Sequence, residues 1–93
     1  MRRYELALVL TAEAGKEPTQ AKKVVSQLVS KAKGKIIKTT VIGLRPLVYR
    51  IKKADQGWYG VFTLKLEPTA VDELDKLIKT ESAVLRHLII KEE

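Results

Sequence analysis

The sequence predicts an α+β fold with four strands and two helices in the order β-α-β-β-α-β. Three observations predict it. Apolar residues alternate with polar ones in several stretches, as is typical of half-buried strands. Two stretches with apolar residues at helical spacing separate them, and proline or glycine stands where the pattern changes. With right-handed crossovers, this order gives a ferredoxin-like split βαβ domain, whose antiparallel sheet is ordered 4-1-3-2 and carries both helices on one face.

The first strand is expected over residues 3–11, where apolar residues recur at every second position. A period of two is typical of a strand with one buried face. The expected inward residues are Tyr4, Leu6, Leu8 and Leu10, and the expected outward residues are Arg3, Glu5, Ala7 and Val9.

The first helix is expected to begin at Pro18, because a proline in the first turn sacrifices no hydrogen bond. Apolar residues then recur at helical spacing as far as Ala32. Gly34 is the expected stop, and Lys31 and Lys33 suit the negative end of the helix dipole.

The second strand is expected from Lys35 to about Lys52, with a bulge or bend at Gly43. Pro46 has no amide hydrogen, so this strand should be an edge strand at that point. In the later part of this strand, inward and outward residues should alternate. Leu47, Tyr49 and Ile51 should face inward, and Val48, Arg50 and Lys52 outward.

A polar hairpin turn is expected over residues 53–57, with Gly57 supplying a positive φ angle. The third strand should then run from Trp58 to Glu67 and end at Pro68. Its expected inward residues are Phe62, Leu64 and Leu66.

Thr69 is expected to cap the second helix, and Asp72 and Glu73 favour the positive end of its dipole. Its buried stripe should hold Val71, Leu74, Leu77 and Ile78. The last strand is expected over Val84 to Lys91, with Leu88 and Ile90 facing inward and His87 and Ile89 facing outward.

The chain has 93 residues and a formal net charge of +7. This length predicts one domain over residues 1–93, and this charge favours a polyanionic partner, with nucleic acid first. No apolar run approaches the roughly 20 residues of a membrane span. The absence of cysteine is compatible with a reducing cytoplasm.

Catalytic chemistry is not predicted. One histidine, no cysteine and three serines offer little for nucleophilic catalysis, and no histidine or aspartate cluster has metal-ligand spacing. We therefore expect neither an enzyme nor a cofactor. His87 is more simply explained as a packing or binding residue.

The sheet face away from the helices is predicted to be a macromolecular docking surface. Its expected residues Ala7, Val9, Val61, Thr63 and Ile89 are too apolar for a fully wetted face, and Arg3, Arg50 and His87 should stand at its edges. Residues 56–62 miss the register of an RNA-recognition RNP1 motif, so stacking of single-stranded bases is not expected.

Three motifs resemble the family of bacterial small-ribosomal-subunit protein six. They are Arg3-Tyr4-Glu5 at the start, the pattern Gly43-x-Arg45-x-Leu-x-Tyr49-x-Ile51-x-Lys53, and residues 83–91 with Arg86-His87. The resemblance implies a non-enzymatic, cytoplasmic ribosomal protein without a membrane partner. It further implies binding to central-domain ribosomal RNA together with small-subunit protein eighteen, and we expect a monomer when the protein is free.

The site residues carried over by this resemblance fall into two groups. The expected RNA-binding residues are Arg2, Arg3, Arg45, Lys52, Lys53, Arg86 and His87. The expected partner-binding residues are Tyr4, Tyr49, Arg50 and Trp58, although the parity of Tyr4 and Tyr49 also favours packing inward. Arginine suits both roles, because its planar fork binds phosphates and stacks on bases.

The sequence departs from the family at two positions of the second strand. The family often has proline where Arg50 stands and a polar or basic residue where Pro46 stands. Two other functions remain open: a small-molecule-binding regulatory domain that dimerises through its sheet, and a chain retained for its fold alone, which would bind RNA weakly.

Overall fold

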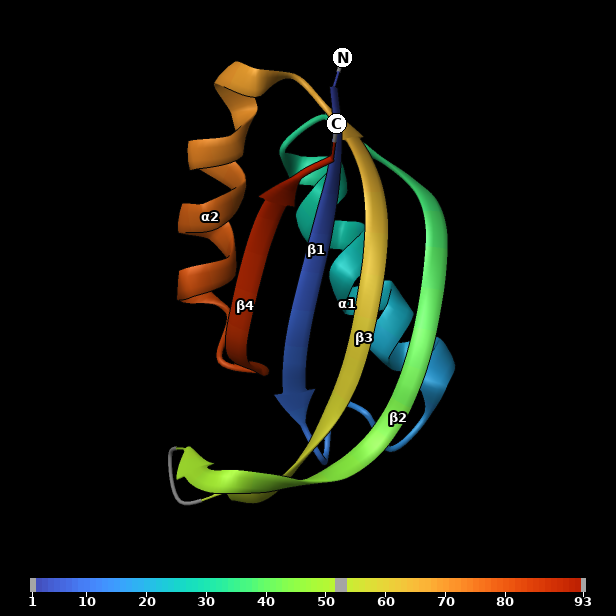
Figure 1. The fold of residues 1–93 in the computed structure, drawn as a ribbon, viewed down its shortest axis with the longest axis vertical. Coiled ribbons are helices and arrows are strands. Elements are labelled where there is room, and N and C mark those ends of the chain that lie inside the picture. The colour runs from blue at the N-terminus through green and yellow to red at the C-terminus, as the bar shows by residue number, and fades with distance from the viewer. Residues whose placement is uncertain (1, 52–53, 93) are drawn as a thin grey trace.

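The computed structural model describes residues 2–51 and 54–92. Its elements are β1 (Arg2–Thr11), α1 (Pro18–Lys31), β2 (Lys35–Ile51), β3 (Ala54–Leu66), a short 3₁₀ turn η1 (Pro68–Ala70), α2 (Val71–Thr80) and β4 (Val84–Lys91). The strands form one antiparallel sheet in the order β2-β3-β1-β4. Figure 1 shows α1 behind the sheet and α2 beside β4. The predicted split βαβ fold and strand order are confirmed.

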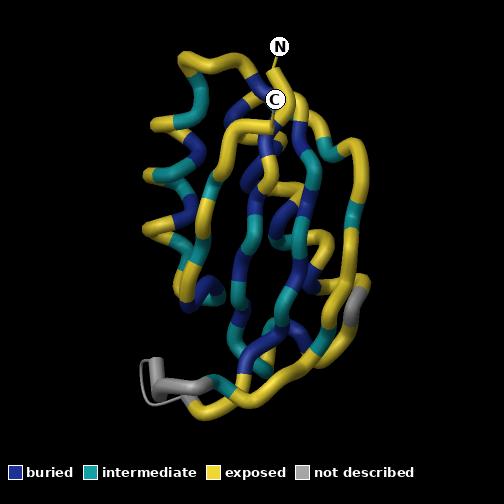
Figure 2. The backbone as a smooth tube through the Cα atoms, in the orientation of Figure 1, coloured by how far each residue is buried: buried dark blue, intermediate teal, exposed yellow. Residues whose placement is uncertain are grey.

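The core lies between the sheet and the two helices. The inward residues predicted for β1 are all buried, and Leu6 and Leu10 have no exposed surface. Figure 2 shows buried residues alternating with less buried ones along β1 and β3. The other fully enclosed side chains include Trp58, Phe62, Leu64, Leu66, Val25, Val29, Leu74 and Ile78. Each such side chain contributes about 1.5–3 kcal/mol through burial.

The C-terminal end of α1 differs from the prediction by one residue. Lys33, not Gly34, has the positive φ angle, at 62°. The Lys33 amide donates to the Ser30 carbonyl and the Gly34 amide to the Val29 carbonyl, both at 2.9 Å, which completes a Schellman motif. Gly34 is needed for close packing, because a Cβ there would lie 2.8 Å from Leu66 Cδ1.

The hairpin of β2 and β3 is longer than predicted. The φ angle of Gly43 is 98° and the register shifts beside it, which confirms the bulge. Pro46 pairs with Gln56 on an edge strand, as predicted. The turn prediction is wrong, because β3 already begins at Ala54 and Gly57 lies within it.

Gly57 serves a different purpose from the one predicted. It pairs with Thr11 of β1 and with Arg45 of β2, and Gly43 alone among the described glycines has a positive φ angle. A Cβ at Gly57 would lie 2.4 Å from Val9 Cγ1. A side chain is therefore excluded by sheet packing and not by a turn.

The start of α2 also corrects a prediction. Thr69 lies inside η1, which runs directly into α2, and no side chain caps the helix there. Asp72 and Glu73 do stand in the first turn, where carboxylates favour the helix dipole. Leu74 and Ile78 form its buried stripe, with Val71 and Leu77 half-buried beside it.

The facing predicted for β4 is wrong. Ile89 pairs with Leu6 and packs against the core, whereas Leu88 and Ile90 are 57% and 48% exposed. Three consecutive apolar residues, 88–90, offer no alternation from which the facing could be read. The register with β1, which shifts between Val9 and Leu10, decides it instead.

Candidate docking face of the sheet

The candidate site is the sheet face away from the helices, called the open face below. Side chains directly opposite each other on antiparallel strands share a face, so the register defines its members. They are Arg3, Glu5, Ala7 and Val9 of β1, Lys35, Lys38, Thr40 and Ile42 of β2, Tyr59, Val61, Thr63 and Lys65 of β3, and Arg86, Leu88 and Ile90 of β4. Within residues 2–51 and 54–92, neither α1 nor α2 covers this face (Figure 1).

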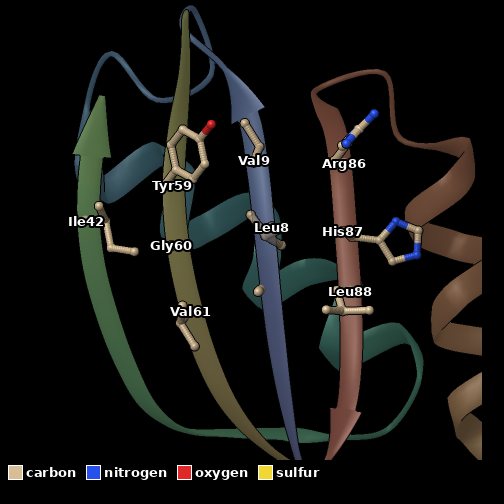
Figure 3. Close-up of a pocket in the computed structure, with 10 residues that line it drawn as sticks. Leu8, Val9, Ile42, Tyr59, Gly60, Val61, Arg86, His87 and Leu88 are labelled. Atoms are coloured by element: carbon tan, nitrogen blue, oxygen red, sulfur yellow. The ribbon is translucent and has the colours of Figure 1, made fainter. Parts of the chain in front are cut away.

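The centre of the open face is an apolar hollow of about 360 Å³. Val9, Tyr59, Val61 and Leu88 project into it from three strands, and Ile42 borders it from β2 (Figure 3). Ala7 and Val9 were predicted here, but Leu88 and Ile90 replace Ile89. The open face is therefore more apolar than the sequence suggested, because two large side chains join it and stand about half exposed.

Arg86 stands at the rim of the hollow. It lies opposite Val9 and is exposed, as its place on the outward side of β4 requires. An arginine beside an apolar surface can bind carboxylates or phosphates while its stem packs on carbon atoms. Tyr59 was missed by the sequence analysis, although its alternation with Trp58 could have placed it on this face.

His87 was predicted to stand on the outward face as an RNA-binding residue, and that facing is wrong. Its ring points toward α2 (Figure 3), where Nε2 lies 2.6 Å from Asp75 Oδ1. Lys79 Nζ lies 3.0 Å from Asp75 Oδ2. The hydrogen bonds from His87 and then Lys79 hold the pKa of Asp75 below its ordinary value. This contact ties β4 to α2, and His87 is unavailable to a ligand on the open face.

Trp58 and Tyr4 were predicted as partner-binding residues, and the structure buries both. Trp58 is 1% exposed and Tyr4 is 6% exposed. The Trp58 ring lies 6.3 Å from the Phe62 ring, between centroids. A Cβ at Gly60 would lie 2.5 Å from Trp58 Cζ3, so glycine makes room for the indole. Both aromatics pack the core, because they share the parity of the other inward residues.

The remaining predicted cations stand at opposite ends of the sheet. Arg2 and Arg3 are exposed where β1 begins, near the chain termini (Figure 1). Arg45 is exposed at the far end of β2, and its Nη1 donates to the Leu44 carbonyl at 2.9 Å. Lys52 and Lys53 lie outside the described residues, as do the side chains of Tyr49 and Arg50. The structure thus brings only part of the predicted site together.

Two further searches bear on the class of protein. Within residues 2–51 and 54–92, no three histidine, cysteine or acidic side chains gather where they could hold a metal ion. Among the helices of the same residues, neither is long and apolar enough to cross a membrane. The fold is a small split βαβ domain, and its site combines a partly apolar sheet face, left open by both described helices, with a basic surface. These features define a docking module.

Comparison with known proteins shows to which family this docking module belongs. The sequence model described as Ribosomal protein S6 matches residues 3–91. A curated relative, the small ribosomal subunit protein bS6 of Corynebacterium efficiens, is 35% identical over 98% of this chain and 97% of its own length. Its counterpart from Clostridium kluyveri is 31% identical over 100% of this chain and 99% of its own. The chain belongs to the ribosomal protein S6 family.

A solved structure agrees with the fold. The 30S ribosomal protein S6 of Thermotoga maritima superposes with a TM-score of 0.82 at 24% identity, over 98% of this chain and 87% of that one. At that identity the likeness supports the architecture alone. The family predicted from three sequence motifs is confirmed by the match over nearly the whole chain.

Proposed function

We propose that this small-subunit ribosomal protein binds central-domain ribosomal RNA jointly with small-subunit protein eighteen. It acts as a non-enzymatic constituent of ribosomes in the cytoplasm and is a monomer when free. The single observation that carries the proposal is the apolar hollow with Arg86 at its rim, on a sheet face that no part of the described chain covers. Family membership supplies the ribosomal context.

The hollow suits a protein partner. Contiguous exposed apolar surface on a small domain marks an interaction site, and tyrosine and arginine are common anchors of such sites. Leu88, Tyr59 and Arg86 supply an aliphatic, an aromatic and a cationic anchor within one surface. We expect protein eighteen to cover them.

The exposed cations suit ribosomal RNA. Phosphate contacts by lysine and arginine release counterions, so binding should weaken as salt rises. Arg2, Arg3 and Arg45 are solvent-accessible for this purpose. Their separation at the two ends of the sheet predicts an extended RNA contact.

Binding to a central-domain RNA fragment, with and without protein eighteen, tests the proposal. We expect protein eighteen to raise the affinity for the RNA. Leu88→Glu should abolish this increase, because it places a charge in the hollow. Gln27→Glu adds the same charge on the exposed side of α1 and should change nothing. Equal affinity with and without protein eighteen would refute joint binding.

Native mass spectrometry of the free protein addresses the regulatory alternative. A monomer without bound metabolite is the result we expect. A dimer that retains a small molecule in the hollow would instead support a regulatory domain that dimerises through its sheet.

A further inference from the structure

A second feature of the open face lies at the end of the sheet that carries the chain termini (Figure 1). Arg3 of β1 stands directly opposite Lys65 of β3, and Lys65 stands directly opposite Lys35 of β2. Directly opposed residues of antiparallel strands project on the same face. The three side chains, called the cation row below, are all exposed and therefore lie side by side across three strands.

The cation row does nothing to stabilise the fold. Like charges directly opposite each other on neighbouring strands repel, and Lys65 has such a neighbour on both sides. None of the three side chains has an ion-pair partner within the described part of the chain. An arrangement that costs stability and lacks an internal counter-charge points to an external anion.

The charged neighbours of the row leave it positive. The amide of Glu92 donates to the Arg3 carbonyl at 3.0 Å, which puts Glu92 at the β4 end of the row. Glu5 stands one step along β1, opposite Thr63, and Lys38 stands on the other side of Thr63. With Glu67, which stands two residues after Lys65 in the chain, three acids accompany four cations, so the row keeps a positive excess.

The row is also separate from the apolar hollow. Residues on one face of a strand recur about every 6.5–7 Å, and Val61 stands two such steps from Lys65. Between them lies Thr63, flanked by Glu5 and Lys38. Along β3 the apolar hollow thus ends about 13 Å from the cation row, whereas on β4 Ile90, opposite Glu5, is an exposed apolar side chain one step from the row.

We propose that the cation row of Arg3, Lys65 and Lys35 binds the phosphate backbone of RNA while the hollow holds a protein. This inference rests on the proposed function and divides its surface into two zones. Neighbouring strands lie about 4.8 Å apart, so the row spans about 10 Å and its long side chains can reach more than one phosphate. Lysine binds phosphate as a point charge without reading bases, so this contact positions RNA and does not specify its sequence.

The variants Lys35→Gln and Lys65→Gln, alone and combined, test the row. Lys22→Gln and Lys23→Gln, which neutralise exposed lysines on α1, are matched controls. The probe is a central-domain small-subunit RNA fragment, titrated between about 50 and 200 mM salt. Each single variant should lower the salt slope by about one, so that its affinity loss over this range shrinks about fourfold, and the double variant should lower the slope by about two. The controls should keep the slope of the unaltered protein.

Thermal melting supplies a second measurement on the same variants. Because Lys65 repels both neighbours, Lys65→Gln should raise the melting temperature at low salt, and the gain should vanish at high salt. A fall in melting temperature at low salt would contradict the repulsion. The melt also shows that any loss of RNA binding is not a loss of folding.

The outcomes separate the two proposals. If the unaltered protein binds the RNA but the double variant keeps its salt slope, the cation row is not a phosphate site and the proposed function stands. If the unaltered protein shows no salt-dependent RNA binding, both fail. If poly-glutamate binds the unaltered protein more tightly than the RNA does at equal charge concentration, and the double variant loses this preference, the row favours acidic protein and the RNA assignment is overturned.

Discussion

The two faces of the sheet are built from the same strands but differ in how deeply their side chains are buried. On the covered face, Leu6, Phe62 and Leu64 have no exposed surface. On the open face, Ala7, Val9 and Val61 are only half-buried, and Leu88 is 57% exposed. Along one strand, the inward residues therefore stabilise the fold, and the outward residues between them are available for docking. The comparison teaches that the two properties should be separable by substitutions at adjacent positions.

The largest difference should appear between Leu8 and Val9. Leu8 is 3% exposed on the covered face, so Leu8→Ala should cost about 2–5 kcal/mol of unfolding free energy. Val9→Ala removes a half-buried side chain on the open face and should cost less than about 1 kcal/mol. Chemical denaturation of both variants measures the contrast. Equal costs would show that the covered face does not dominate stability.

Gly60→Ala should produce the next largest effect. Its new Cβ would lie 2.5 Å from Trp58 Cζ3, and the enclosed indole cannot move without disturbing the core. Overpacking of this kind costs about 1–3 kcal/mol. Gly43→Ala is the comparison, because nothing lies within 4 Å of a Cβ built at Gly43. The positive φ angle of 98° alone should there lower the free energy of unfolding by about 1–2 kcal/mol.

A smaller effect is expected from the contact that joins β4 to α2. The lowered pKa of Asp75 means that its ionised form is stabilised by folding. That contribution is present above the ordinary value of 3.8 and is lost as the pH falls through the lower folded-state pKa. Because Asp75 is 35% exposed, Asp75→Asn should cost no more than about 1 kcal/mol at pH 7.

The pH dependence of this variant provides its check. Denaturation of Asp75→Asn and of the unaltered protein should differ at pH 7 and converge toward pH 2. In a double-mutant cycle with His87→Gln, the two substitutions should not be additive. Additive effects, or a difference that persists at pH 2, would show that the Asp75–His87 hydrogen bond does not stabilise the fold.

The smallest effect on stability is expected from Leu88→Glu. The side chain it replaces is mostly in water, so the free energy of unfolding should change by less than about 0.5 kcal/mol. The thermal melt of this variant should overlay that of Gln27→Glu. A clearly lower melting temperature would mean that Leu88 belongs to the core after all.

The sequence predicted the fold where its pattern alternated without ambiguity. β1 and the later part of β3 have large apolar residues at every second position, so their buried residues could be read directly. The edge position of β2 followed from Pro46, and the bulge from Gly43. In each case a property of a single residue type restricts either the backbone conformation or the side of the sheet on which a side chain lies.

The predictions that failed depended on neighbours that are distant in sequence. The facing of Leu88, Ile89 and Ile90 is decided by pairing with β1, and His87 finds its partner on α2. Gly57 resembles a turn glycine in sequence, yet Val9 is what excludes a side chain there. The cation row escaped notice because Arg3, Lys35 and Lys65 meet only through strand register.

The central claim is that the open face docks a protein partner while the covered face holds the fold together. The most direct test measures how much protein eighteen increases RNA affinity for Leu88→Glu and Gln27→Glu, with both variants shown to be folded. We predict that the increase disappears in Leu88→Glu and persists in Gln27→Glu. An undiminished increase in folded Leu88→Glu would contradict the claim.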